Sequence, residues 1–191
     1  MIDLHMHSLY SDDGEFTPGQ LVEMCHEAGV KIMAIADHNW VKAIYEAKKK
    51  AEAEKAALPK PYNETENATA KIAELVKKAK KENKNIILQA GGNWCIWCLR
   101  FNNFVQTTPE LKTLVDNNYV YYHLNFSPKN KNEKVFAKYG NPGEKYGYPV
   151  FIVLDKTGKM IHTQDSSVLE EGKGYSLEKV KTFFNEWKPS K

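Results

Sequence analysis

The sequence has little cysteine, no long apolar run and no basic, apolar leader at its start. Only 3 of its 191 residues are cysteine, which is too few for a disulfide-rich scaffold. No stretch is apolar for the roughly 20 residues that a membrane-spanning helix needs. The first residues include Asp3, His5 and His7 in place of a secretory signal. We therefore expect a chain without a membrane span, and the sequence leaves its cellular compartment undetermined.

Charges of both signs are present in similar number. The chain has 27 basic and 24 acidic side chains, for a net charge of +3. The lysine-rich stretches 47–55 and 77–84 lack the aromatic or glycine pattern that accompanies base stacking. We interpret them as solvated helix faces and predict no nucleic-acid partner. A hydrophobic fraction of 42% indicates packed cores.

The chain divides into two parts near its prolines. Pro59 and Pro61 cannot continue the helical pattern before them, and polar residues follow. We place a first domain at 1–57, a linker at 58–67 and a second domain at 68–191.

Both parts have the pattern of an α/β fold. The first predicts strand, helix, strand and helix, at residues 2–7, 17–29, 30–38 and 39–57. The second opens with a helix at 68–84 and continues with a strand at 85–91, helices at 95–105 and 108–118, a strand at 118–127, a short helix at 132–140, strands at 148–155 and 159–165, and a helix at 176–188. A mixed sheet flanked by helices is the predicted architecture of the second part.

The segment GGNWCIWCLRF contains the cysteine pair Cys95 and Cys98, between a strand end and a helix start. A zinc site would need about four ligands, and the nearest candidates are His123 and His162 on predicted strands. Two ordinary buried cysteines would not explain the flanking glycines and tryptophans. Redox chemistry is the interpretation that these neighbours favour.

The helix start assigns different roles to the two cysteines. Cys95 faces unpaired backbone N–H groups and the positive end of the helix dipole, which stabilise its thiolate. Cys98 lies about one turn further along the same face, where it can attack a mixed disulfide formed by Cys95. We predict Cys95 as the nucleophile and Cys98 as the resolving cysteine.

The stretches NIILQAGGNWCIWC and YGYPVF resemble the thioredoxin superfamily, in particular bacterial thioredoxin-like proteins with a WCxWC site, over about residues 62–190. The resemblance implies that Pro149 follows a cis peptide bond and faces the cysteine pair. It further implies that Tyr148 presents backbone groups to a substrate. We interpret Trp94 and Trp97 as residues of the substrate groove that serve partly in packing and partly as a substrate platform, with packing favoured for Trp97.

Two positions depart from thioredoxin itself. Gln89 stands where thioredoxin has a buried, proton-transferring Asp, and Ile96 and Trp97 replace its Gly-Pro centre. Deprotonation of Cys98 would then need water or another group, and the direction of electron transfer stays open.

The stretches IDLHMHS, SDDG and AIADH resemble the first motifs of the PHP (polymerase and histidinol phosphatase) family. His5 and His7 alternate along a strand, so both project to one side. With Asp12 or Asp13 and with His38, they would bind zinc, manganese or iron, which in that family activates water for phosphoester hydrolysis. The later ligands of that family are missing, and two strands cannot close a barrel. We interpret this part as a truncated PHP piece fused to the second domain.

The sequence thus predicts a thiol-disulfide oxidoreductase that acts on protein thiols and disulfides, needs no dissociable cofactor and is reset by a redox partner. The alternatives are a metal-dependent phosphoesterase in the first part and a thioredoxin-fold binding module without turnover. Uncovered apolar residues such as Ile32, Ala34 and Ile35 predict self-association through the first part.

Overall fold

The computed structural model describes residues 2–11, 14–37 and 42–190. The chain forms two compact units, Met1–Leu58 and Pro59–Lys191. The stretch 58–67, expected from the sequence to be a linker, is therefore almost entirely part of the second unit. No helix in the described ranges is long and apolar enough to cross a membrane.

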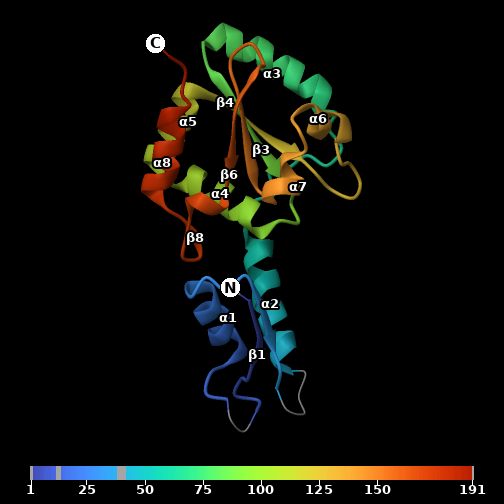
Figure 1. Cartoon of the computed structure of the whole chain (residues 1–191), viewed down its shortest axis with the longest axis vertical. Helices are drawn as coiled ribbons and strands as arrows, with labels where there is room; N and C mark the ends of the chain where they lie inside the picture. The colour runs from blue at the N-terminus through green and yellow to red at the C-terminus, as the bar shows by residue number, and fades with distance from the viewer. Residues whose placement is uncertain (1, 12–13, 38–41, 191) are drawn as a thin grey trace. The chain divides into compact units, whose positions relative to one another are not determined.

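The first unit has the predicted strand-helix-strand-helix order (Figure 1). Its elements are β1 (Ile2–Met6), α1 (Pro18–Glu27), β2 (Ile32–Ile35) and α2 (Lys42–Ala57). The two strands pair in parallel, with Ile2 opposite Ile32. Thr17 and Gln20 form a capping box at the start of α1, which satisfies backbone N–H groups that the helix itself leaves unpaired. Of the three residues expected to be uncovered, Ile32 is 54% exposed, whereas Ala34 and Ile35 are half-buried.

The second unit contains the longer series of elements. They are α3 (Ala68–Glu82), β3 (Asn85–Gly91), α4 (Ile96–Thr107), α5 (Pro109–Asn118), β4 (Tyr119–Asn125), α6 (Glu133–Lys138), α7 (Pro142–Tyr146), β5 (Val150–Leu154), β6 (Met160–Asp165), the 3-10 turn Ser167–Leu169, β7 (Glu170–Glu171), β8 (Gly174–Tyr175) and α8 (Leu177–Glu186). The predicted α/β fold class is confirmed. Sequence patterns missed α7 and the β7–β8 hairpin because elements this short contain too few residues to show a period.

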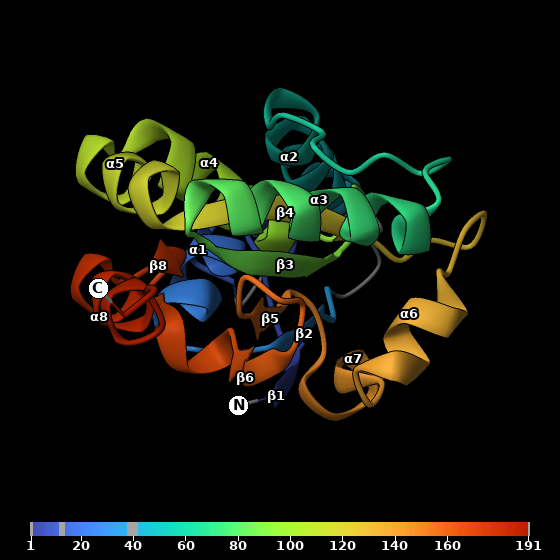
Figure 2. The same ribbon diagram turned by 90° about the horizontal axis from the view of Figure 1, so that it is seen from above.

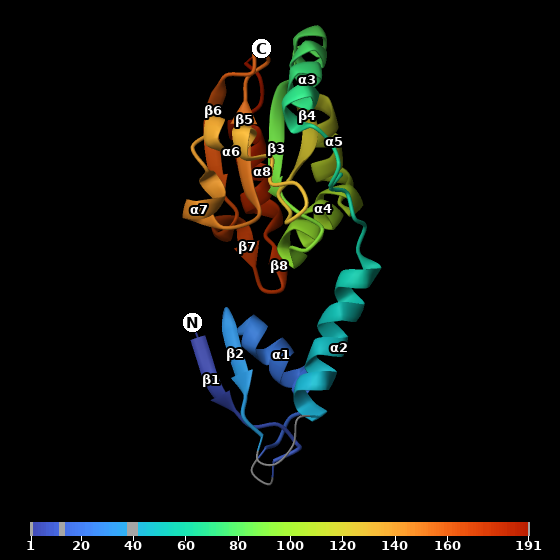
Figure 3. The same ribbon diagram turned by 90° about the vertical axis from the view of Figure 1, so that its right-hand side faces the viewer.

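The main sheet has the strand order β4-β3-β5-β6 (Figure 3). β3 pairs in parallel with β4 and antiparallel with β5. All seven residues of β3 are buried, as expected for a central strand covered on both faces. Ala90 lies opposite Val150. The C-terminal end of β3 and the N-terminal end of β5 therefore lie at the same end of the sheet.

Helices cover both faces of this sheet. The first core contains apolar residues of α3 and α6 packed on the strands, and the second contains residues of α4, α5 and α8. Figure 2 shows α5 and α8 on one side of the strands and α6 and α7 on the other. Successive side chains of β3 point to opposite faces of the sheet, so Leu88 packs in the first core and Ile87 in the second.

Phe101 of α4 is central to the second core. It is fully buried, and its ring centroid lies 4.4 Å from that of Phe151 and 4.8 Å from that of Tyr175. Phe101→Ala should lower the free energy of unfolding by about 3–5 kcal/mol, because it removes this buried area and leaves a cavity.

Urea unfolding followed by circular dichroism would measure this loss. The control Val168→Ala, at a side chain that is 56% exposed, should change the unfolding free energy by less than about 0.5 kcal/mol. Equal effects of the two substitutions would contradict the placement of Phe101 in the core.

Candidate functional site

The cysteine pair lies where β3 ends and α4 begins. Cys95 and Cys98 form a disulfide. Cys95 is the N-cap residue of α4, and its sulfur accepts a hydrogen bond from the Cys98 backbone N–H at 3.1 Å. Cys95 is 6% exposed, whereas Cys98 is fully buried. The helix start thus directs a backbone donor at the outer sulfur, as the sequence predicts.

Two glycines let the chain pass close to this disulfide. A Cβ atom on Gly91 would collide with Cys98 Sγ, and one on Gly92 would collide with the indole of Trp94. Glycine is therefore required sterically at both positions before the pair, because any larger residue would collide with the cysteine or the tryptophan.

The segment before β5 faces the pair from the other side. The Tyr148–Pro149 peptide bond is cis, as the resemblance to thioredoxin implies. Cys95 Sγ lies 3.5 Å from the carbonyl oxygen of Tyr148. The Tyr148 ring stacks on Phe126, with a centroid distance of 5.2 Å. The predicted neighbour Tyr148 therefore meets the cysteine pair, and Pro149 follows it in the chain.

The two tryptophans have different surroundings. Trp94 is 44% exposed, donates its indole N–H to the Phe126 carbonyl and contacts Tyr148 edge to face. Trp97 packs against the second core, where its ring meets the edge of Tyr175 at 5.7 Å. Of these two side chains, Trp94 offers the larger aromatic surface to solvent beside the disulfide.

An uncharged polar layer lies beneath Cys98. Gln89 is fully buried, and its side-chain N–H donates to the Cys98 carbonyl at 2.9 Å. Its oxygen accepts the Tyr121 hydroxyl at 2.7 Å. Burial raises the pKa of Tyr121 well above its usual range, so this residue stays neutral. The layer positions the backbone of Cys98 without placing a carboxylate beside it.

Sequence reasoning missed two residues of this layer as part of the site. Tyr62 is 3% exposed and packs directly against Cys95 and Cys98. His123 contacts the Tyr62 ring edge to face at 5.1 Å. Burial lowers the pKa of His123 to about 4. The polar stretch around Tyr62 has no local signal for this position, because only the packing of the second unit brings it to the cysteines.

In the first unit, the structure brings together part of the predicted metal set. The Nε2 atoms of His5 and His7 lie 3.0 Å apart, so both side chains project to one side as expected. Asp12, Asp13 and His38 lie outside the described residues. Within the described ranges, no group of three or more His, Cys, Asp or Glu side chains is arranged to hold a metal ion.

Asp37 organises the loop after β1 and was not singled out from the sequence. Its carboxylate accepts the Ser8 backbone N–H at 2.5 Å, the Ser8 hydroxyl at 2.6 Å and the Ser11 hydroxyl at 3.2 Å. Burial raises the pKa of Asp37, but these hydrogen bonds lower it by more, so the net direction is downward. Asp37 therefore fixes the loop through its charged form.

Two family models match the chain. A model described as thioredoxin-like matches residues 67–156, and a model described as the PHP domain matches residues 3–88. Both matches include residues 67–88, and these fall in the second unit, as α3 and the start of β3. The second unit is a thioredoxin-like domain. The first unit is a fragment of a PHP domain.

One solved structure shares the fold of the thioredoxin-like domain, and a second is reported as a weaker similarity. A disulphide isomerase from Xylella fastidiosa Temecula1 is 22% identical, with a TM-score of 0.59 over 68% of this chain and 98% of that chain. The C-terminal domain of Neisseria meningitidis DsbD in its oxidised form is 17% identical, with a TM-score of 0.43 over 62% of this chain and 94% of that chain. No curated protein matches the chain.

The buried imidazole of His123 should make the protein less stable in mild acid. Its pKa is lowered from 6.5 to about 4, so the unfolded chain binds a proton that the folded state excludes. The free energy of unfolding is therefore highest above pH 6.5 and falls as the pH drops toward 4, by on the order of 3 kcal/mol.

Urea unfolding across this pH range would measure the loss. His123→Gln should flatten the pH dependence of the unfolding free energy, because the variant lacks the titrating group. The control His162→Gln changes a histidine that stacks on Trp187 outside this layer. This variant should show the same pH dependence of the unfolding free energy as the unsubstituted protein. A profile unchanged by His123→Gln would show that His123 does not titrate in this way.

Proposed function

We propose that the thioredoxin-like domain is a thiol-disulfide oxidoreductase acting on protein substrates. The observation that supports this most directly is Cys95 at the first turn of α4, with the Cys98 N–H donating to its sulfur. The same donor that meets the disulfide sulfur would stabilise a Cys95 thiolate after reduction, and the thiolate is the nucleophile in thiol-disulfide exchange.

The reaction proceeds by two exchanges. Reduced Cys95 attacks a substrate disulfide, so that a Cys95–substrate bond forms and one substrate thiolate leaves. Cys98 then attacks Cys95 Sγ, which re-forms the Cys95–Cys98 disulfide and releases the second substrate thiolate. The substrate gains two electrons and the protein loses two. Complete burial of Cys98 restricts it to this second step.

The residues beside Cys95 would position the substrate. Pro149 offers no N–H group, and the Tyr148 carbonyl lies 3.5 Å from Cys95 Sγ. An extended substrate segment can donate a backbone N–H to that carbonyl while its disulfide approaches Cys95. The exposed indole of Trp94 adds an apolar surface at the same place.

The electrons reside on the two cysteines, so the proposed reaction uses no dissociable cofactor. After each turnover, a redox partner must return the pair to its starting state. Which partner does so depends on the reduction potential of the pair relative to its compartment.

Replacing Cys98 should trap the first intermediate. A Cys98→Ala protein keeps the nucleophile but cannot resolve it, so we expect mixed disulfides between Cys95 and substrate proteins in a lysate. Non-reducing electrophoresis and mass spectrometry would detect them as species that a reductant releases.

The matched control is the Cys95→Ala, Cys98→Ala double variant, which leaves only the buried Cys25. It should form none of these species. Equal capture by both proteins, or none by Cys98→Ala, would contradict the assigned roles.

A redox titration separates this proposal from a binding module without turnover. Equilibration with glutathione, read by fluorescence of Trp94 and Trp97, should show a reversible two-electron transition. A disulfide that does not exchange over hours would favour the binding module.

For the PHP fragment, a complete metal centre is not supported by the described residues. His5 and His7 would supply two nitrogen ligands, fewer than the three or four that zinc sites use. We therefore derive no phosphoester hydrolysis from this unit. Metal analysis of the purified protein tests whether the pair binds zinc, manganese or iron.

A further inference from the structure

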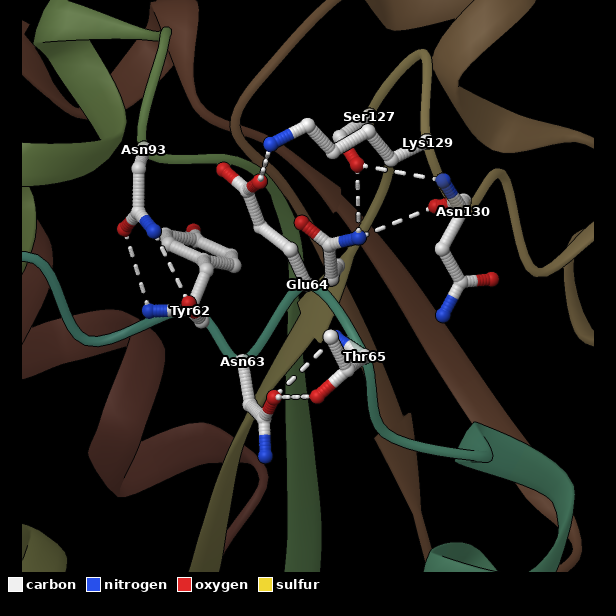
Figure 4. Close-up of polar contacts among 9 residues, drawn as sticks. Tyr62, Asn63, Glu64, Thr65, Asn93, Ser127, Lys129 and Asn130 are labelled. Atoms are coloured by element: carbon white, nitrogen blue, oxygen red, sulfur yellow. Dashed lines mark hydrogen bonds and ion pairs between the residues drawn. The ribbon is translucent and has the colours of Figure 1, made fainter.

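The segment before α3 is fixed to the loop that contains the cysteines. The Tyr62 backbone N–H donates to the Asn93 side-chain oxygen at 3.1 Å, and the Asn93 side-chain N–H donates to the Tyr62 carbonyl at 2.8 Å (Figure 4). This reciprocal pair joins Tyr62 to a residue two positions before Cys95. The backbone at Tyr62 is therefore held at the redox site.

Further contacts hold the residues that follow. The Asn130 side-chain N–H donates to the Glu66 carbonyl at 3.0 Å. Lys129 and Glu64 form an ion pair at 3.9 Å (Figure 4). Tyr62 thus enters the site from a segment held at both ends, by Asn93 and by the loop after β4.

The Tyr62 hydroxyl lies near the buried sulfur. A Cβ atom on Gly91 would lie 3.0 Å from this hydroxyl oxygen and closer still to Cys98 Sγ. The hydroxyl and the sulfur therefore both lie next to Gly91. The hydroxyl is buried, its proton has no hydrogen-bond acceptor in the described part of the chain, and the Gln89 side chain lies near enough to its oxygen to lower the Tyr62 pKa against the larger effect of burial. A buried, unpaired donor costs free energy, and here it lies beside a sulfur that accepts poorly while it is in a disulfide.

Titratable groups around Cys98 are neutral near pH 7. Burial raises the pKa of Tyr62, Tyr121 and Tyr175 above the ordinary value, and it lowers the pKa of His123 to about 4. Gln89 carries no charge. These neighbours place no base beside Cys98, so its thiolate would depend on hydrogen-bond donors rather than on a charged partner.

We propose that Tyr62 is a positioning residue for the resolving step, whose hydroxyl donates a hydrogen bond to the Cys98 thiolate once the disulfide is reduced. This role deepens the proposed oxidoreductase function and rests on it. The unpaired donor of the oxidised state becomes paired in the reduced state. Tyr62 therefore favours the reduced dithiol over the disulfide.

Tyr62 keeps its proton throughout this step. The Cys98 thiol loses its proton to water, and the thiolate attacks Cys95 Sγ of the mixed disulfide. The Cys95–Cys98 bond forms, the Cys95–substrate bond breaks, and the substrate thiolate leaves with the electron pair and takes a proton from water. The Tyr62 hydroxyl stabilises the charge on Cys98 before the attack.

Tyr62→Phe tests this role because it removes the hydroxyl and retains the ring. In a Cys95→Ala background, we expect it to raise the pKa of Cys98 by about 1 to 2, a loss of about 10- to 100-fold in the ionisation constant. NMR of isotope-labelled cysteine Cβ atoms measures that pKa.

The matched control is Tyr139→Phe. The Tyr139 hydroxyl is also buried without a partner in the described residues, but it lies in the core with α3 and α6. It should leave the pKa of Cys98 unchanged. An equal pKa in the Tyr62→Phe variant and its parent would overturn the proposal.

A second measurement uses the unsubstituted protein. Reduction of the disulfide should slow the exchange of the Tyr62 hydroxyl proton with water, because the proton becomes hydrogen bonded. Unchanged exchange would contradict the proposal even if Tyr62→Phe failed to fold. Both results are independent of substrate capture, so a raised Cys98 pKa without captured proteins would refute the oxidoreductase function but not the hydrogen bond.

Discussion

The antiparallel pairing of β3 with β5 is the constraint on which the redox site depends. Ala90 lies opposite Val150, so the cysteine loop after β3 and the Tyr148–Pro149 segment before β5 lie at the same end of the sheet. Cys95 Sγ lies 3.5 Å from the Tyr148 carbonyl although the two residues are 53 positions apart. Because both strands are buried in the sheet, a slip of one residue would turn their core side chains to the wrong face.

The environment of the two sulfurs follows from that arrangement. Cys95 meets a backbone N–H at the start of α4, whereas Cys98 is seated over Gln89, whose side chain is already bonded to the Cys98 carbonyl and the Tyr121 hydroxyl. In such a layer, burial disfavours charge on every titratable group, so fixed donors replace ionised neighbours in stabilising a thiolate. This gives the outer and inner cysteines different chemistry within one turn of helix.

The two units differ in how completely they bury their strands. In the thioredoxin-like domain, helices cover both faces of a four-stranded sheet. The PHP fragment has two parallel strands, and Ile32 on β2 is 54% exposed. Both family models match residues 67–88. Packing assigns these residues to the thioredoxin-like domain, since Ile72 and Ile86 lie in the same core.

By itself, the sequence determined the order of the longer elements and the reactive pair. Apolar periodicity located the central strand at 85–91, and the glycines and tryptophans around Cys95 and Cys98 indicated a redox centre at a helix start, because these signals are local. The tertiary structure alone decided that Tyr62 packs against the inner cysteine and that His123 contacts the Tyr62 ring. Their positions depend on strand register and on the hydrogen bonds between Tyr62 and Asn93, which join residues distant in sequence and leave no periodic pattern along the chain.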